Sequence, residues 1–187
     1  MSNTILDQDI AYTLVSEEKI NSIVTKIAAD IDRDYMNSGK KLLLLCILKG
    51  SVVFMGELMK KITLPLEIDF MKVSSYGSGT TSQGRINIML DLHRDDFEDL
   101  NILIIEDIVD SGKTLSHLTK YLELKGAHSV KTVALLDKPS RREVDFNPDY
   151  MGKEIPDEFV VGFGLDYDEK FRNLPYIGVL KREVYSK

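Results

Sequence analysis

Apolar residues recur along the chain in two patterns, one typical of helices and the other of buried strands. Between residues 20 and 31 they return every three or four positions, which predicts an amphipathic helix. Ser16 stands before two glutamates and this stretch, so it is expected to be the N-cap residue of that helix. Helical spacing also predicts helices over 52–61 and about 113–125, with Gly126 as the C-cap of the latter.

Short apolar runs alternate with these helices. The run at 42–48 contains no polar residue, as expected of a strand buried on both faces of a sheet. Further strands are predicted at 66–73, 86–92, 101–109, 130–136, 158–163 and 176–180. The repeated alternation of strand and helix predicts an α/β fold with a doubly wound, mainly parallel sheet.

One stretch between two predicted strands has a different composition. Residues 74–84 are polar and rich in Gly, Ser and Thr, with Tyr76 as their one aromatic residue. Length and composition there suit a mobile loop better than a hairpin turn.

Composition narrows the class of protein. The 187 residues, 43% of them hydrophobic, predict one domain with a sizeable core. The net charge is −6 and no dense block of Lys or Arg occurs, so no nucleic-acid partner is expected. The apolar run at 42–48 is too short to cross a bilayer, and the first residues lack the features of a secretory signal. A cytoplasmic protein with no membrane partner is the expectation.

Cysteine and histidine offer little chemistry. Cys46, the single cysteine, lies within an apolar run, which predicts a buried thiol and excludes an internal disulfide. The three histidines are scattered without metal-ligand spacing, so a zinc site is not expected.

The most informative segment is 104–114, Ile-Ile-Glu-Asp-Ile-Val-Asp-Ser-Gly-Lys-Thr. A buried strand ends in two adjacent acids, Glu106 and Asp107, and Asp110 then opens a turn into a helix. The unpaired backbone N–H groups of such a turn can hold a phosphate, with Gly112 allowing close approach. The acids stand at the carboxyl end of the strand, where ligands of open α/β sheets bind. They can accept hydrogen bonds from sugar hydroxyls or hold a hydrated Mg²⁺.

Two other interpretations of this segment compete with that one. Gly-Lys-Thr ends the ATP-binding P-loop, but that motif requires a glycine five residues before Gly112, where this chain has Asp107. Three acids would also repel a triphosphate, so a P-loop is excluded. The remaining alternative is a capped helix after an acidic loop, in which Asp110 serves only as the N-cap.

The segment resembles the signature with which type I phosphoribosyltransferases bind phosphoribosyl pyrophosphate. Further matches narrow the resemblance to the hypoxanthine-guanine phosphoribosyltransferases, and they lie at 48–51, 75–77, 136–139, 158–162, 165–167 and 171–174. The resemblance implies one domain over 1–187. Its core would cover about 38–140, and a small hood from about 1–15 and 141–187 would lie over the carboxyl edge of the sheet.

The resemblance also implies which residues bind the sugar, the phosphates and the metal. Glu106 and Asp107 would contact the ribose hydroxyls directly or through Mg²⁺, and Asp166 would help to bind a second Mg²⁺. Lys49 and Gly50 would hold the pyrophosphate, with Arg172 as a bidentate partner. In the family the peptide bond before this lysine, here Leu48–Lys49, is often cis. The 5-phosphate would be held by Asp110, Ser111, Gly112, Lys113 and Thr114.

A second set of residues is implied for the base. Lys138 would donate to the exocyclic oxygen of a 6-oxopurine, because a lysine can only donate. Asp110 would face purine N7 as the general base or acid. Phe159 would stack on the base, the Val160 backbone would read its edge, and Ser75 with Tyr76 would close over the site.

Ordinary structural roles remain as alternatives for three of these side chains. Phe159 could pack in the core, whereas Lys49 and Lys138 could be solvated lysines at a strand end and in a loop.

The function implied by the resemblance is purine salvage. Phosphoribosyl pyrophosphate and hypoxanthine or guanine would give IMP or GMP plus pyrophosphate, with Mg²⁺ as cofactor and a homodimer or homotetramer as the assembly. One alternative is a regulatory module that binds phosphoribosyl pyrophosphate and nucleic acid, against which the acidic charge balance argues. The other is a relative that prefers xanthine or uses a pyrimidine, whereas Lys138 and the tail from Phe159 to Arg172 favour purines.

Overall fold

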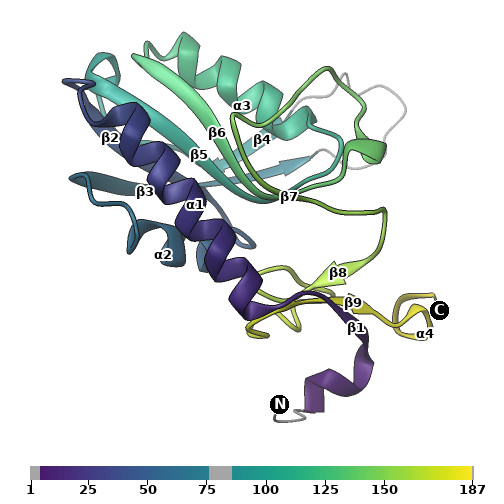
Figure 1. Ribbon diagram of the computed structural model, residues 1–187. Coiled ribbons are helices and arrows are strands. Elements are labelled where there is room, and N and C mark those ends of the chain that lie inside the picture. The colour runs from purple at the N-terminus through teal and green to yellow at the C-terminus, as the bar shows by residue number, and fades with distance from the viewer. Residues whose placement is uncertain (1–4, 76–85, 187) are drawn as a thin grey trace.

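The computed structural model describes residues 5–75 and 86–186 and contains a large and a small sheet (Figure 1). The large sheet is formed by β2 (Lys41–Ile47), β3 (Leu66–Ser75), β4 (Ile86–Leu90), β5 (Leu100–Val109), β6 (Ser129–Asp137) and β7 (Tyr150–Glu154). Their order is β4-β3-β2-β5-β6-β7, and all neighbours are parallel except β3 and β4. The predicted α/β class with a mainly parallel sheet is confirmed.

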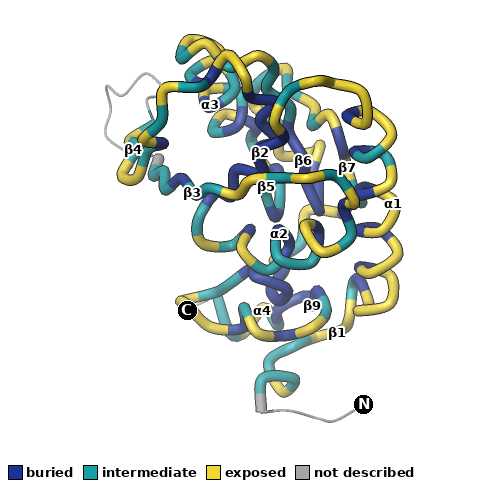
Figure 2. The backbone as a smooth tube through the Cα atoms, turned by 90° about the vertical axis from the view of Figure 1, so that its left-hand side faces the viewer, coloured by how far each residue is buried: buried dark blue, intermediate teal, exposed yellow. Residues whose placement is uncertain are grey.

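Helices cover both faces of this sheet because successive side chains of a buried strand point to opposite sides. One face of β2, with Leu42 and Leu44, packs in one core with α1 (Glu17–Tyr35) and α2 (Val52–Met59). The other face, with Leu43 and Leu45, packs in a second core with α3 (Lys113–Leu124). Figure 2 shows the buried residues gathered on the central strands between these layers. The sheet is therefore doubly wound, as predicted.

The ends of the helices follow the local sequence signals. The Ser16 hydroxyl accepts a hydrogen bond from the Lys19 N–H at 3.3 Å, which confirms the predicted N-cap of α1. The C-cap residue of α3 is Lys125, not Gly126 as predicted; Gly126 follows it with φ +91°, donates its N–H to Glu123 O at 2.9 Å and turns the chain out of the helix. The helix α2 ends at Met59, two residues before the predicted end.

The small sheet forms the hood. Its strands are β1 (Ile10–Val15), β9 (Ile177–Leu180) and β8 (Val160–Val161), antiparallel and in that order. The strand predicted at 158–163 is this short because Gly162 (φ +99°) and Phe163 (φ +51°) turn the chain. The strands β1 and β7 were not predicted, and β7 pairs with β6 of the large sheet although it lies within the expected hood segment 141–187. Short helices complete the chain: η1 (Ile5–Asp9), η2 (Phe97–Asp99), η3 (Pro139–Arg141) and α4 (Arg182–Tyr185).

The loop predicted at 74–84 lies outside the described residues from residue 76 onward, and Tyr76 with it. Its first two residues belong to β3, and Ser75 pairs with Ile86 of β4. The two flanking strands are therefore antiparallel neighbours, a hairpin-like arrangement that the composition of the loop did not predict. Within the described ranges, no helix is long and apolar enough to cross a membrane.

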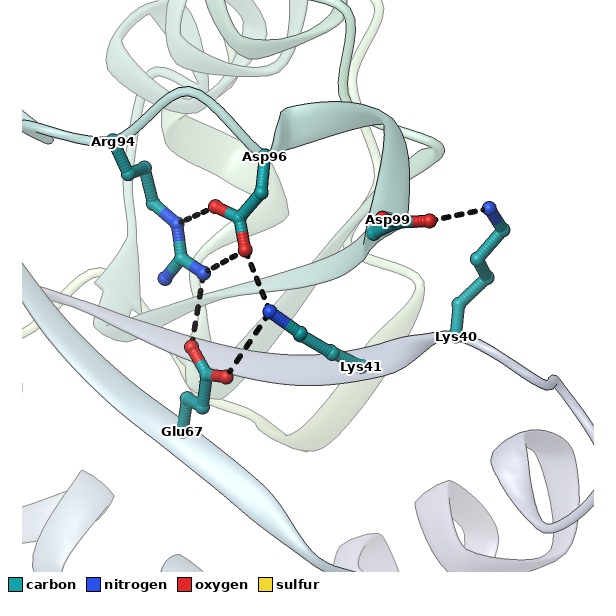
Figure 3. Close-up of polar contacts among 6 residues, drawn as sticks. All are labelled: Lys40, Lys41, Glu67, Arg94, Asp96 and Asp99. Carbon is teal, nitrogen blue, oxygen red and sulfur yellow. Dashed lines mark hydrogen bonds and ion pairs between the residues drawn. The ribbon is translucent and has the colours of Figure 1, made fainter.

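An ion-pair network links the amino ends of β2 and β3 to the segment that precedes β5 (Figure 3). Asp96 accepts from Arg94 Nε at 2.7 Å and from Lys41 Nζ at 2.8 Å, and Arg94 also binds Glu67 at 2.9 Å. Lys40 pairs separately with Asp99 at 2.8 Å. The hydrogen bonds from Arg94 and Lys41 hold the pKa of Asp96 well below its usual range.

Candidate active site

The turn between β5 and α3 has the geometry of a phosphate-binding loop. Gly112 occupies the N-cap position of α3 with φ +78°, and a Cβ there would lie only 3.0 Å from Arg142 Cδ. The turn is held from outside by a hydrogen bond from the Glu143 N–H to Ser111 O at 3.0 Å. Position 112 therefore carries no side chain that would crowd the first N–H groups of α3. These groups lie at the positive end of the helix dipole.

Asp110 is not the N-cap of α3, because the cap position lies two residues further on. Its side chain is half exposed. The alternative in which Asp110 serves only as the N-cap is therefore excluded. Ser111, Lys113 and Thr114 lie in the same turn and in the first residues of α3, as the signature predicted.

Glu106 and Asp107 lie side by side near the carboxyl end of β5. The Ser51 hydroxyl accepts from the Asp107 N–H at 3.2 Å and donates to Glu106 Oε2 at 3.5 Å. Burial raises the pKa of Glu106 well above its usual range, and the charge of Asp107 raises it further. Burial also raises the pKa of Asp107, to about 6. Each of the two carboxyl groups therefore holds its proton more tightly than an exposed acid does.

The loop after β2 packs directly against these acids. The Leu48–Lys49 peptide bond is cis, the isomer that the resemblance described above implies is often found before this lysine. A Cβ on Gly50 would lie 1.7 Å from Asp107 Oδ2, and a Cβ on Gly164 would lie 2.0 Å from Gly50 O. Glycine at both positions lets three backbone segments meet that are more than 50 residues apart. Gly164 was not predicted as a site residue.

The hood loop after β8 contains Arg172 and contacts Lys49, the two cations predicted to hold pyrophosphate. Arg172 donates to Gly164 O at 2.8 Å and pairs with Asp166 at 2.9 Å. Lys49 Nζ lies 3.1 Å from Glu169 Oε2, and the same carboxylate pairs with Arg172 at 3.3 Å. Glu169 was missed by sequence reasoning because nothing in its local sequence pairs it with a lysine 120 residues away.

The residues predicted for the base lie on the other side of Asp110. Lys138 is 8% exposed, and its ammonium donates to Glu158 O at 2.7 Å and lies 3.9 Å from Asp110 Oδ1. A solvated loop lysine is thereby excluded. Phe159 is 37% exposed, so it does not belong to the core. Val160 beside it is buried.

Aromatic side chains surround Phe159. Its ring stacks on Tyr185 with centroids 4.8 Å apart and planes at 22°, and meets Tyr167 edge-on at 5.5 Å. Tyr185 comes from the short helix α4 and was not predicted. No periodic pattern marks an aromatic residue so close to the end of the chain.

A buried ion pair supports the turn from beneath. Arg142 binds the Asp137 carboxylate at the end of β6, and its other terminal nitrogen donates to Asp110 O at 2.5 Å. The side chains of Arg142 and Asp137 are 14% and 7% exposed. This support also escaped prediction, since nothing in the local sequence links Arg142 to Asp110, 32 residues earlier in the chain.

Comparisons with known proteins show which family the chain belongs to. Residues 13–168 match the model of the phosphoribosyl transferase domain family. A hypoxanthine-guanine phosphoribosyltransferase of Streptococcus thermophilus is 48% identical over 97% of this chain and 99% of its own length. The Staphylococcus aureus protein of the same name is 49% identical, with the same shares covered. The chain belongs to the hypoxanthine-guanine phosphoribosyltransferases.

Solved structures place this phosphoribosyltransferase among the same proteins. A hypoxanthine phosphoribosyltransferase from Staphylococcus aureus superposes with a TM-score of 0.93 at 48% identity, covering all of both chains. A mutant of the Trypanosoma cruzi hypoxanthine phosphoribosyltransferase, solved as a ternary substrates complex, has a TM-score of 0.90 at 38% identity, covering 95% of this chain and 99% of its own.

The phosphoribosyltransferase has a donor set that suits Mg²⁺. Among the residues described, no three His, Cys, Asp or Glu side chains are grouped closely enough to hold a metal alone. Mg²⁺ characteristically takes one or two carboxylates and completes its shell with water and substrate phosphates. Glu106 and Asp107 offer hard oxygen donors, and they lie at the carboxyl end of β5, beside the turn into α3. These residues fit Mg²⁺.

Proposed function

We propose that this phosphoribosyltransferase transfers the 5-phosphoribosyl group of phosphoribosyl pyrophosphate to hypoxanthine or guanine. The products would be IMP or GMP and pyrophosphate, as in purine salvage. The names of the full-length relatives support this activity. The observation that carries the choice of base is the buried Lys138 ammonium beside the Asp110 carboxylate.

Lys138 and Asp110 together suit a 6-oxopurine. An ammonium has three N–H donors and no acceptor, and one of the three goes to Glu158 O. A second would donate to the 6-oxo group, whereas a 6-amino group would present another donor and be disfavoured. Asp110 would accept or return the proton at purine N7 as the base attacks. Phe159 would stack on the base while the Val160 backbone contacts its edge.

The sugar phosphate would bind across the two loops that Gly50 and Gly112 shape. The 5-phosphate would accept from the N–H groups of the turn and α3, and Lys49 and Arg172 would bind the pyrophosphate. The C1′–O bond to pyrophosphate breaks with oxocarbenium character on the ribose, and the C1′–N9 bond forms on the opposite face. The two cations stabilise the negative charge that develops on the leaving group.

Glu106, Asp107 and Asp166 would hold Mg²⁺. When bound, the ion supplies positive charge beside the ribose hydroxyls and the departing pyrophosphate. A closing segment at Ser75 and Tyr76 remains part of this proposal as the element that would exclude water.

A steady-state assay with phosphoribosyl pyrophosphate and Mg²⁺ tests the function against five bases: hypoxanthine, guanine, xanthine, adenine and uracil. We expect turnover with hypoxanthine and guanine, and kcat/KM lower by roughly 10²-fold or more with adenine and uracil. Chelation of Mg²⁺ should abolish turnover. Adenine or uracil used as well as hypoxanthine would contradict the proposal, and a preference for xanthine would change the base assigned to the pocket.

We also propose that the protein is cytoplasmic and forms a homodimer or homotetramer. The exposed apolar side chains of Val52, Met59 and Ile68, on α2 and β3, support self-association. The free, buried thiol of Cys46 suits a reducing compartment. Light scattering that gives the mass of a monomer at micromolar concentration would contradict the assembly.

A further inference from the structure

One carboxylate lies between the two cations assigned to pyrophosphate. Glu169 Oε2 is 3.1 Å from Lys49 Nζ and 3.3 Å from the terminal nitrogen of Arg172. Lys49 follows β2 of the large sheet, whereas Glu169 and Arg172 belong to the hood loop, so this contact joins the two parts of the molecule. The proposed reaction gives Glu169 no role in binding or catalysis.

The backbone of the hood loop presents this carboxylate. Asp168 (φ 51°) and Glu169 (φ 61°) are consecutive residues with a left-handed backbone conformation. Residues other than glycine adopt this conformation only at a cost in free energy. The Glu169 N–H donates to Asp166 Oδ2 at 2.9 Å, which fastens the bend. Lys49 and Arg172 both donate hydrogen bonds to this exposed carboxylate.

We propose that Glu169 is an internal competitor of pyrophosphate. In the free enzyme it pairs with Lys49 and shares Arg172 with Asp166, and it has to leave both cations when the pyrophosphate group binds. It therefore sets how tightly the enzyme holds the pyrophosphate end of its substrate and how fast it releases the pyrophosphate product. This inference rests on the proposed function, because only a pyrophosphate ligand needs both cations.

The ion pair between Lys49 and Glu169 can open because both side chains are exposed to solvent. The side chains of Lys49 and Glu169 are 55% and 65% exposed, so they can separate without unpacking the core. Exposed ion pairs are weak, and two of them together correspond to about a 3- to 10-fold change in affinity. Arg172, 25% exposed and anchored on Gly164 O, stays in place when Glu169 moves.

A different role for Glu169 predicts the opposite sign. If its carboxylate joined Asp166 in binding a metal with the pyrophosphate, removing its charge would weaken pyrophosphate binding. A competitor, in contrast, tightens binding when its charge is removed. The direction of the change in affinity therefore separates the two roles.

The test compares Glu169→Gln with Asp168→Asn. Asp168 is the adjacent exposed acid, and its ion pair is with Lys170 at 3.6 Å, so the control removes the same charge beside the site without touching Lys49 or Arg172. Calorimetry with inorganic pyrophosphate and Mg²⁺ should give a Kd about 3- to 10-fold lower for Glu169→Gln than for the wild type. Glu169→Ala should show the same tightening, because the charge rather than the shape competes.

Kinetics provide the second readout. The KM for phosphoribosyl pyrophosphate should fall in Glu169→Gln, while the Kd for GMP, which lacks the pyrophosphate group, should not change. Unchanged or weaker pyrophosphate binding in Glu169→Gln would overturn the inference, as would equal tightening in Asp168→Asn. Pyrophosphate binding needs no purine, so a wild type that binds pyrophosphate but transfers to no base would contradict the proposed function alone.

Discussion

The guanidinium of Arg142 donates a hydrogen bond at 2.5 Å to the carbonyl oxygen of Asp110, the residue that opens the turn between β5 and α3. Its second terminal nitrogen binds the carboxylate of Asp137, directly before Lys138. One side chain therefore connects the segment that would bind the 5-phosphate with the segment that would read the base. The planar fork of an arginine can bridge two such acceptors, which the single ammonium of a lysine cannot do in the same geometry.

Replacing Arg142 should affect stability and ligand binding separately. Arg142→Met leaves the buried Asp137 carboxylate without its partner, so the free energy of unfolding should fall by about 3–5 kcal/mol. Adding Asp137→Leu removes that charge and should restore most of the stability in urea unfolding. The Kd for GMP should stay several-fold higher than that of the wild type, because nothing then holds Asp110 O. A double variant that binds GMP normally would show that Arg142 only stabilises the fold.

Asp110→Asn should separate binding from chemistry. The amide keeps the size of the side chain but cannot accept the proton from the purine, so kcat should fall by about 10²–10³. The Kd for phosphoribosyl pyrophosphate should stay within a few-fold, because the turn binds phosphate mainly through its backbone. Asp95→Asn is a suitable control, since Asp95 is exposed and precedes the amino end of β5. Normal turnover in Asp110→Asn would rule out its role as general base.

Lys138→Gln should reduce the preference of the enzyme for hypoxanthine over adenine. Hydrogen bonds from charged donors contribute about 1.5–3 kcal/mol, so kcat/KM for hypoxanthine should fall by about 10- to 100-fold. The ratio of kcat/KM for hypoxanthine to kcat/KM for adenine should fall, because the glutamine amide can accept a hydrogen bond as well as donate one. Lys120→Gln on the exposed face of α3 controls for the loss of charge. Equal kcat/KM for hypoxanthine in wild type and Lys138→Gln would mean that another group reads the base.

The ionisation of Asp96 should make the stability of the protein depend on pH in the acidic range. Its pKa in the folded state is lowered by Arg94 and Lys41, so its contribution is present above the pKa of an unfolded aspartate, about 4, and is lost as the pH falls below it. Asp96→Asn should therefore lower the urea midpoint at pH 7, and the difference from wild type should shrink at pH 3. The neighbouring Asp95→Asn should change neither midpoint. A constant difference at all pH values would exclude this ionisation as its cause.

Local signals were sufficient for much of the fold. The apolar run of β2, the helical periodicity of α1 and its N-cap Ser16 lie where the pattern placed them, and the C-cap of α3 lies one residue before the predicted Gly126. The strands β1 and β7 were missed, since each is short and carries several exposed residues. The strand at 158–163 was predicted too long, because an apolar run does not reveal the positive φ of Phe163.

The sequence by itself determined the class of fold and, through its motifs, the family, and it located the turn between β5 and α3 that we propose binds phosphate. Each of these depends on residues close together in the chain. Only the tertiary structure decided which distant groups meet at the site. The order of parallel strands brings Gly50 against Asp107, and the return of the hood loop sets Gly164 on Gly50 and Glu169 on Lys49. Such contacts depend on how whole elements pack, and no periodicity or spacing records them. For this reason the cations Lys49 and Arg172 could be predicted from motifs, whereas the carboxylate between them could not.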